Sequence, residues 1–295
     1  MLLCAGCASQ STPPAAVPDS EQYLPPDVEA MSLLGKPLHP PQLSSDVQKQ
    51  REDALANAMR ELEAERIDPG AAVTVSDRLA DLGRYREAID LLSDWIHAHP
   101  NDARLYLARG HRFINVRRFS AAVNDLQSAS LLDRHNRDIL YHLGLAHYLL
   151  GEFDQALAAY TQCLRLSTAP DDLVATSNWM YMTLRRLGSQ QEADKLLEPI
   201  SIDLDVKQNV AYHKLLLMYG GEIAPEELAR QDVNTTDGAT LLYGVGNWRY
   251  VSGRTDSALP MWREILDGNQ SFSFGYIAAE AEVARLDKRQ ASRGQ

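Results

Sequence analysis

Histidines are the residues of this chain most able to do acid–base or metal chemistry, and eight are present. His142 and His147 are five residues apart, which on a helix places their side chains about 140° apart and prevents them from sharing one metal ion. The zinc-protease, nucleophile-elbow and phosphate-loop patterns do not occur. One hydrolase hypothesis combines His111 with Asp77 or Asp81. We expect no enzyme, no cofactor and no metal.

The three cysteines do not form a metal-binding or disulfide framework. Cys4 and Cys7 have the CxxC spacing, but a zinc ribbon needs a second such pair, and Cys163 stands alone in a helical pattern. Ala5-Gly6-Cys7 resembles the end of a bacterial lipoprotein signal, in which the cysteine is lipidated, although Cys4 and the missing basic and apolar parts depart from that pattern. We therefore expect 1–7 to be a truncated signal and Cys7 to carry a lipid anchor.

The charge of the chain argues against general nucleic-acid binding. The formal net charge is −11 and the isoelectric point is about 5.2, so a phosphate backbone is repelled. Arg117-Arg118 and Arg185-Arg186 are the obvious candidates for a local basic patch, and we interpret both pairs as solvated helix ends. No other stretch reaches about 18 apolar residues, so we expect no transmembrane helix.

The elements that must position any site begin after a proline-rich stretch. Eight of the 14 prolines lie before residue 42, and proline fixes φ and removes hydrogen-bond donors. Residues 8–44 therefore read as an extended tether, in which the apolar piece 31–34 is a candidate for docking on the body. Helical spacing begins near Ser45 and predicts an N-terminal helix within 45–68.

A period of 34 residues follows: at several positions, identical or similar side chains recur every 34 residues. We call each such set of positions a column. Glycine or alanine occupies columns where two helices cross, and aromatic residues occupy the turn between them. The columns are Ala88, Ala122 and Ala156; Tyr85, Phe119 and Phe153; Gly110 and Gly144; and Gly83 and Gly151, with Arg117 between them. The large residues Leu92, Leu126 and Tyr160 follow each alanine by four positions. Internal repeats of this length predict stacked helix hairpins.

These columns resemble the tetratricopeptide repeat family, which implies an all-α solenoid of stacked antiparallel hairpins in a superhelix. Three units, 69–102, 103–136 and 137–170, make up 69–170. Diverged hairpins and a capping helix then fill 171–286, with weaker units at 174–204 and 239–272, and 287–295 is expected to be a charged tail. The layout is also similar to that of the NlpI-like envelope lipoproteins, which act as adaptors.

The family resemblance also implies a concave binding groove lined by fixed positions of each first helix. Carried onto this sequence, these positions are Asp77, Asp81, Arg104, His111, Asn115, Tyr141, Tyr148, Asn178, Arg185, Arg186, Tyr243, Asn247 and Tyr250. Tyrosine, asparagine and arginine supply flat apolar area together with hydrogen bonds, which suits the recognition of a peptide or partner protein.

The leading hypothesis is a non-enzymatic scaffold or adaptor, anchored by Cys7 to the bacterial envelope and facing the periplasm, that binds a protein partner in this groove. The alternative is a cytosolic module of the same repeat type in a regulatory or assembly complex. An apolar signal encoded in frame upstream of Met1 would support the envelope-anchored hypothesis and exclude the cytosolic one.

Overall fold

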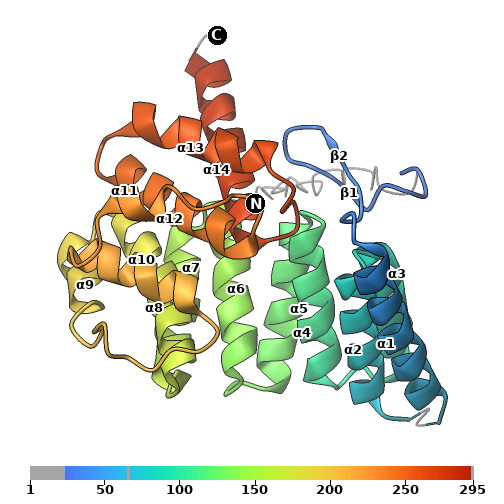
Figure 1. Cartoon of the computed structure of the whole chain (residues 1–295). Coiled ribbons are helices and arrows are strands. Elements are labelled where there is room, and N and C mark those ends of the chain that lie inside the picture. Colours follow the sequence, from blue (N-terminus) through green and yellow to red (C-terminus); the bar gives the residue numbers. More distant parts are fainter. Residues whose placement is uncertain (1–23, 65–66, 294–295) are drawn as a thin grey trace, which may run out of the picture.

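A computed structural model describes residues 24–64 and 67–293, and in these ranges the chain is mostly helical, with two short strands (Figure 1). Three helix pairs follow a first helix, α1, and stack side by side in chain order. The bounds of these helices are α1 Ser45–Ala64, α2 Pro69–Asp81, α3 Tyr85–Ala98, α4 Ala103–Asn115, α5 Phe119–Leu132, α6 Arg137–Leu150 and α7 Phe153–Leu166. The prediction of an all-α solenoid is confirmed.

The first helix of each pair begins at a side-chain cap that itself recurs every 34 residues. Asp68, Asp102 and Asn136 each accept a hydrogen bond from a backbone N–H in the first turn of α2, α4 and α6. These caps satisfy donors that the helix cannot pair internally. At the other end, Gly83 and Gly151 adopt positive φ and turn the chain into the second helix.

In the α4–α5 and α6–α7 pairs, a glycine on the first helix accepts a large side chain from the second. A Cβ on Gly110 would lie 2.8 Å from Leu126, and one on Gly144 would lie 2.7 Å from Tyr160. Both distances are too short for real carbon contacts, so only glycine permits this approach. Gly246 and Trp262 repeat the same arrangement, at 2.7 Å, in a later pair.

The alanine column is buried throughout, which leads to a direct test of the register. Ala88, Ala122 and Ala156 have no solvent exposure. We expect Ala122→Leu to lower the free energy of unfolding by about 1–3 kcal/mol, because the added atoms must push α4 and α5 apart. Urea denaturation measures this loss, and Gln127→Leu on the exposed face of α5 is the matched control. Equal stability of the two variants would contradict the register.

The C-terminal half continues with less regular pairs and then turns back on the first half. Its helices are α8 Pro170–Arg186, α9 Gln190–Lys195, α10 Val210–Gly220, α11 Pro225–Leu228, α12 Thr236–Val251, α13 Thr255–Asp267 and α14 Phe274–Arg293. Figure 1 shows α14 reaching the end of α6, and α14 contacts α6 as well as α12 and α13. α14 continues to Arg293 and so includes most of the segment 287–295 that was expected to follow it as a charged tail.

The proline-rich stretch also departs from prediction within the described residues. We call residues 24–44 the strap. Its two short strands, β1 Ala30–Met31 and β2 Pro37–Leu38, pair antiparallel, and Val28, Ala30 and Leu38 are buried. The Glu29 carboxylate accepts a hydrogen bond from the Arg86 backbone N–H at 2.9 Å, at the start of α3. This part is therefore packed on the body rather than extended as a tether, because burial of its few apolar side chains is favourable.

Among the described residues, none of the helices combines the length and apolar character that a membrane span requires.

Candidate functional site

Several of the predicted groove residues are buried in the folded chain. Six of them are buried: Asn115, Tyr141, Tyr148, Asn178, Tyr243 and Asn247. The expectation that these six residues line an open groove was therefore wrong. The reason is the curvature of the chain, which brings its C-terminal helices back against α6.

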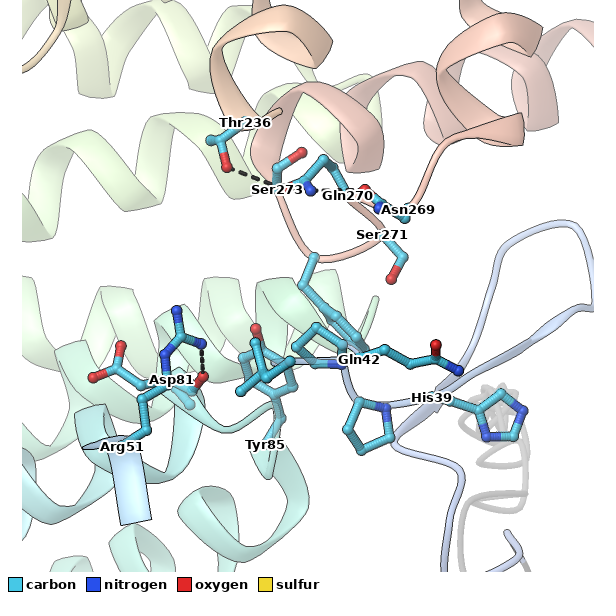
Figure 2. A pocket seen from close by; sticks show the side chains of 15 residues that line it. His39, Gln42, Arg51, Asp81, Tyr85, Thr236, Asn269, Gln270, Ser271 and Ser273 are labelled. Carbon is cyan, nitrogen blue, oxygen red and sulfur yellow. Dashed lines mark hydrogen bonds between the residues drawn. The ribbon is translucent and has the colours of Figure 1, made fainter. Parts of the chain in front are cut away.

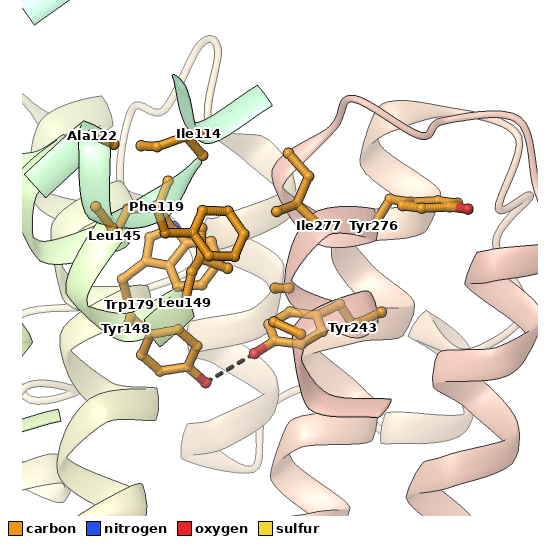
Figure 3. Packing of buried hydrophobic residues seen from close by; sticks show 14 of the residues in the cluster. Ile114, Phe119, Ala122, Leu145, Tyr148, Leu149, Trp179, Tyr243, Tyr276 and Ile277 are labelled. Carbon is orange, nitrogen blue, oxygen red and sulfur yellow. Dashed lines mark hydrogen bonds between the residues drawn. The ribbon is translucent and has the colours of Figure 1, made fainter. Parts of the chain in front are cut away.

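Three of these buried residues form one polar cluster between α6 and α12 (Figure 3). The hydroxyls of Tyr148 and Tyr243 are 2.9 Å apart, and the Tyr148 hydroxyl also donates to the Asn247 side-chain oxygen at 3.3 Å. Burial raises the pKa of Tyr148 to about 12, so its phenol stays protonated at neutral pH. The ring of Trp179 lies 5.3 Å from that of Tyr148 and closes the cluster on one side.

Arg117 forms a buried ion pair with α14, contrary to the expectation of a solvated helix end. Its side chain is 2% exposed and that of Glu280 is 1% exposed, with 2.7 Å between the guanidinium Nη2 and the carboxylate Oε2. Arg117 also donates to the Ser271 carbonyl. It occupies the turn position that Gly83 and Gly151 hold in the neighbouring pairs, and its φ is 64°. A non-glycine residue is strained there, and the ion pair holds it in place.

Arg186 forms a second buried ion pair with α14, so the expectation that it is a solvated helix end was also wrong. Its Nη1 lies 2.8 Å from the Glu282 carboxylate, and these side chains are 5% and 2% exposed. Arg285 donates to the same carboxylate at 2.7 Å and to the Leu149 carbonyl at 2.7 Å. Burial acts to raise the pKa of Glu282, but Arg186 and Arg285 outweigh it and hold that pKa below its ordinary value.

The residues of the hydrolase hypothesis do not assemble into one site. The His111 ring contacts His142 and Phe274, at centroid distances of 4.5 and 5.4 Å. Burial lowers the pKa of both imidazoles, which favours their neutral forms. The Asp77 carboxylate instead accepts a hydrogen bond from Arg112 at 2.9 Å. His111 and His142 are 31 residues apart, about one helical turn short of the repeat, and the repeat pattern did not predict their contact.

Three further predicted residues make polar contacts within the molecule. Arg104 is exposed and pairs with Asp102 at 2.7 Å, while Arg185 donates to the Tyr181 hydroxyl at 2.8 Å. Tyr250 accepts a hydrogen bond from Arg289 of α14 at 3.3 Å. These contacts orient each side chain within the molecule.

A pocket of about 670 Å³ remains open where the strap, the first helix pair and the loop between α13 and α14 meet (Figure 2). Asp81 is the predicted groove residue that lines it. The strap contributes five lining residues, and the loop contributes five more. In full, the lining consists of His39, Pro40, Pro41, Gln42, Leu43, Arg51, Ala80, Asp81, Tyr85, Thr236, Asn269, Gln270, Ser271, Phe272 and Ser273.

The pocket combines an aromatic base with hydrogen-bonding groups at its rim. The rings of Tyr85 and Phe272 are 4.5 Å apart. Gln270 bonds to Thr236 and to the Asn234 carbonyl, which fixes the loop, while Gln42 is exposed on the strap side. Aromatic area beside amides and hydroxyls can hold an extended stretch of polypeptide. Among the described residues, no cluster of three or more histidines, cysteines or carboxylates has metal-binding geometry.

Sequence reasoning missed the pocket because most of its residues lie outside the repeat. The loop from Asn269 to Ser273 belongs to no repeat column, and the strap precedes the first unit. The sequence did contain a signal that Arg117 has a special role, since this charged residue replaces glycine in the column of turn glycines.

Comparison with known families identifies one of the helix pairs. The model of the tetratricopeptide repeat family matches residues 138–167, which coincide with α6 and α7. DnaJ homolog subfamily C member 3 of Rattus norvegicus is 26% identical over 152 residues, covering 52% of this chain and 28% of the relative. The Gallus gallus protein of the same name is 27% identical over 109 residues, covering 37% and 21%. The chain therefore spans less than a third of the length of these relatives.

Solved structures with similar helix arrangements include a thermophilic TPR protein of Thermus thermophilus, at 22% identity and a TM-score of 0.47. The match covers 58% of this chain and 92% of that one. The APC/C hetero-tetramer Cut9-Hcn1 matches at 18% identity and a TM-score of 0.49, covering 83% of this chain and 48% of that chain.

Proposed function

We propose that this chain, a tetratricopeptide repeat protein, is a protein-binding scaffold without enzymatic activity. The repeat fold is that of a protein-interaction scaffold. The observation that carries the proposal is the open pocket between the strap, the first helix pair and the 269–273 loop, which joins exposed amides of the strap and of the loop to the Tyr85–Phe272 rings. The occupant is an extended segment of a partner protein, because such a segment offers backbone groups to the rim and a side chain to the rings.

Site-specific photocrosslinking tests this function. A photoreactive amino acid at Gln42, on the rim of the pocket, should form a discrete crosslinked product with a partner protein in the native cell. The matched control is the same amino acid at Gln155, which is exposed on α7, away from the pocket. Identical products at both positions, or products only at Gln155, would reject the pocket as the binding site.

We further propose that the scaffold is anchored to the bacterial envelope through Cys7 and faces the periplasm. The support is the Ala5-Gly6-Cys7 sequence ahead of a proline-rich stretch; Cys7 lies outside the described residues. A lipid chain on this cysteine would attach the protein to a membrane surface without spanning it.

Cell fractionation of the protein expressed from its natural gene tests the anchor. We expect the unaltered protein and Cys4→Ser in the membrane fraction, and Cys7→Ser in the soluble fraction, because only Cys7 has the lipidation context. A Cys7→Ser protein that stays with the membrane would refute the anchor, and an unaltered protein found in the cytosol would favour the cytosolic alternative.

A further inference from the structure

The 269–273 loop, which forms one wall of the pocket, rests on side chains of α4. The Asn115 side-chain amide donates a hydrogen bond to the Phe272 carbonyl at 3.2 Å. Two residues further along the chain, the Phe274 ring lies 5.4 Å from the ring of His111. Asn115 and His111 are four residues apart, so they lie on one face of α4. The position of this wall therefore depends on the side chains beneath it.

Beneath Phe274, the structure places two histidines side by side. The rings of His111 on α4 and His142 on α6 have centroids 4.5 Å apart, and the Phe274 ring lies 6.1 Å from that of His142. The His142 Nδ1–H donates to the Asp138 carbonyl at 2.8 Å, which fixes the orientation of that ring. Because each first helix supplies one imidazole, the pair spans two successive repeat units and supports the residue that follows the loop.

The surroundings of this pair oppose a positive charge on it. Burial is the largest cause that lowers the pKa of both imidazoles, and the Arg112 guanidinium acts in the same direction on each of them. Arg137 of α6 adds to this effect at His142. Asp138 acts the other way, but its side chain is exposed, and Asp77 of α2 pairs with Arg112. From α14 the pair meets an uncharged aromatic ring.

Acid therefore works against the packing at this place. Above a pH of about 6.5, the stability that comes from the neutral pair is fully present, and it is lost as the pH falls below that value, because the unfolded chain then binds more protons. Two protonated rings would also repel each other at this short distance. Asn269 is exposed and residues 270–274 are only partly buried, so the loop can shift while the helices stay in place.

We propose that the pocket is regulated by protons: it holds its partner at neutral pH and releases it in acid, when the His111–His142 pair becomes charged beneath the 269–273 loop. The proposal rests on the scaffold function above and concerns the same site. A partner that needs the loop seated on the neutral pair opposes proton uptake, and protons weaken the partner by the same factor. Histidine is the side chain suited to such a response near neutral pH.

NMR titration of the full chain tests the switch without a partner. With isotope-labelled histidines and backbone amides, His111 and His142 should titrate below about pH 6.5, and the amide shifts of residues 269–274 should follow the same midpoints. The double variant His111→Gln, His142→Gln should abolish this titration of the loop. His39→Gln should preserve it, although His39 lines the pocket. Loop amides that stay unchanged between about pH 7.5 and about pH 5 in the unaltered chain would overturn the proposal, whether or not any variant folds.

Crosslinking at Gln42 then measures the effect on binding. With an extract of the native cell as the source of the partner, the yield of the discrete product should fall about tenfold between about pH 7.5 and about pH 5. The His111→Gln, His142→Gln variant should give equal yields at the two pH values. A matched variant with His97→Gln and His135→Gln, both at exposed positions, should respond like the unaltered chain.

The outcomes separate regulation from the scaffold function. A discrete product of equal yield at both pH values in the unaltered chain would reject the regulation alone. The same tenfold fall in the double variant would also reject it, because the two histidines would then not be the cause. Absence of any product at either pH would reject the pocket as the binding site, and the regulation with it.

Discussion

Replacing Arg117 by methionine should lower the free energy of unfolding by about 3–5 kcal/mol, because Glu280 then stays buried without a countercharge. The two side chains are 163 positions apart in sequence and almost fully buried together. Equilibrium urea denaturation followed by circular dichroism measures the loss. Arg263→Met, at an exposed position of α13, should change stability by less than about 0.5 kcal/mol.

The double variant separates the ion pair from the packing of the arginine. Adding Glu280→Gln to Arg117→Met removes the unpaired charge, so most of the lost stability should return. A double variant as unstable as the sum of the two single variants would mean that the two side chains do not interact.

Trp262→Ala should also lower the free energy of unfolding by about 3–5 kcal/mol, since it leaves a large cavity. The Trp262 ring is fully buried against Gly246, with Tyr243 and Tyr250 at ring-centroid distances of 6.5 and 5.4 Å. Thermal and urea unfolding give the loss. Trp95→Ala is the control, because Trp95 is only partly buried. A loss for Trp262 no greater than for Trp95 would contradict the equivalence of the α12–α13 pair with the earlier repeats.

The 34-residue period predicted the local structure well because each column has a local cause. Caps, turn glycines and crossing alanines act within one hairpin, and a hairpin that cannot cover its own apolar face must stack on the next. The starts of α2, α4 and α6, at Pro69, Ala103 and Arg137, follow this interval.

The closure of the concave side could not be predicted in this way. The path of a solenoid depends on small rotations between successive pairs, and these accumulate over many residues. The repeat pattern therefore assigns side chains such as Tyr148 and Tyr243 to the inward face. It does not predict that these two residues, 95 positions apart in sequence, contact each other. For the same reason, the sequence alone did not predict that Arg186 pairs with Glu282 of α14.

α14 packs against α6 as well as α12 and α13, and so covers part of the concave side. Hydrogen exchange of the α14 backbone amides measures this most directly, because an isolated helix of this length frays and exchanges quickly in water. The structure predicts strong protection for residues 276–284, comparable to that of α6, and weak protection for residues 288–292, where the side chains are exposed. Fast exchange throughout α14 alongside a protected α6 would contradict it.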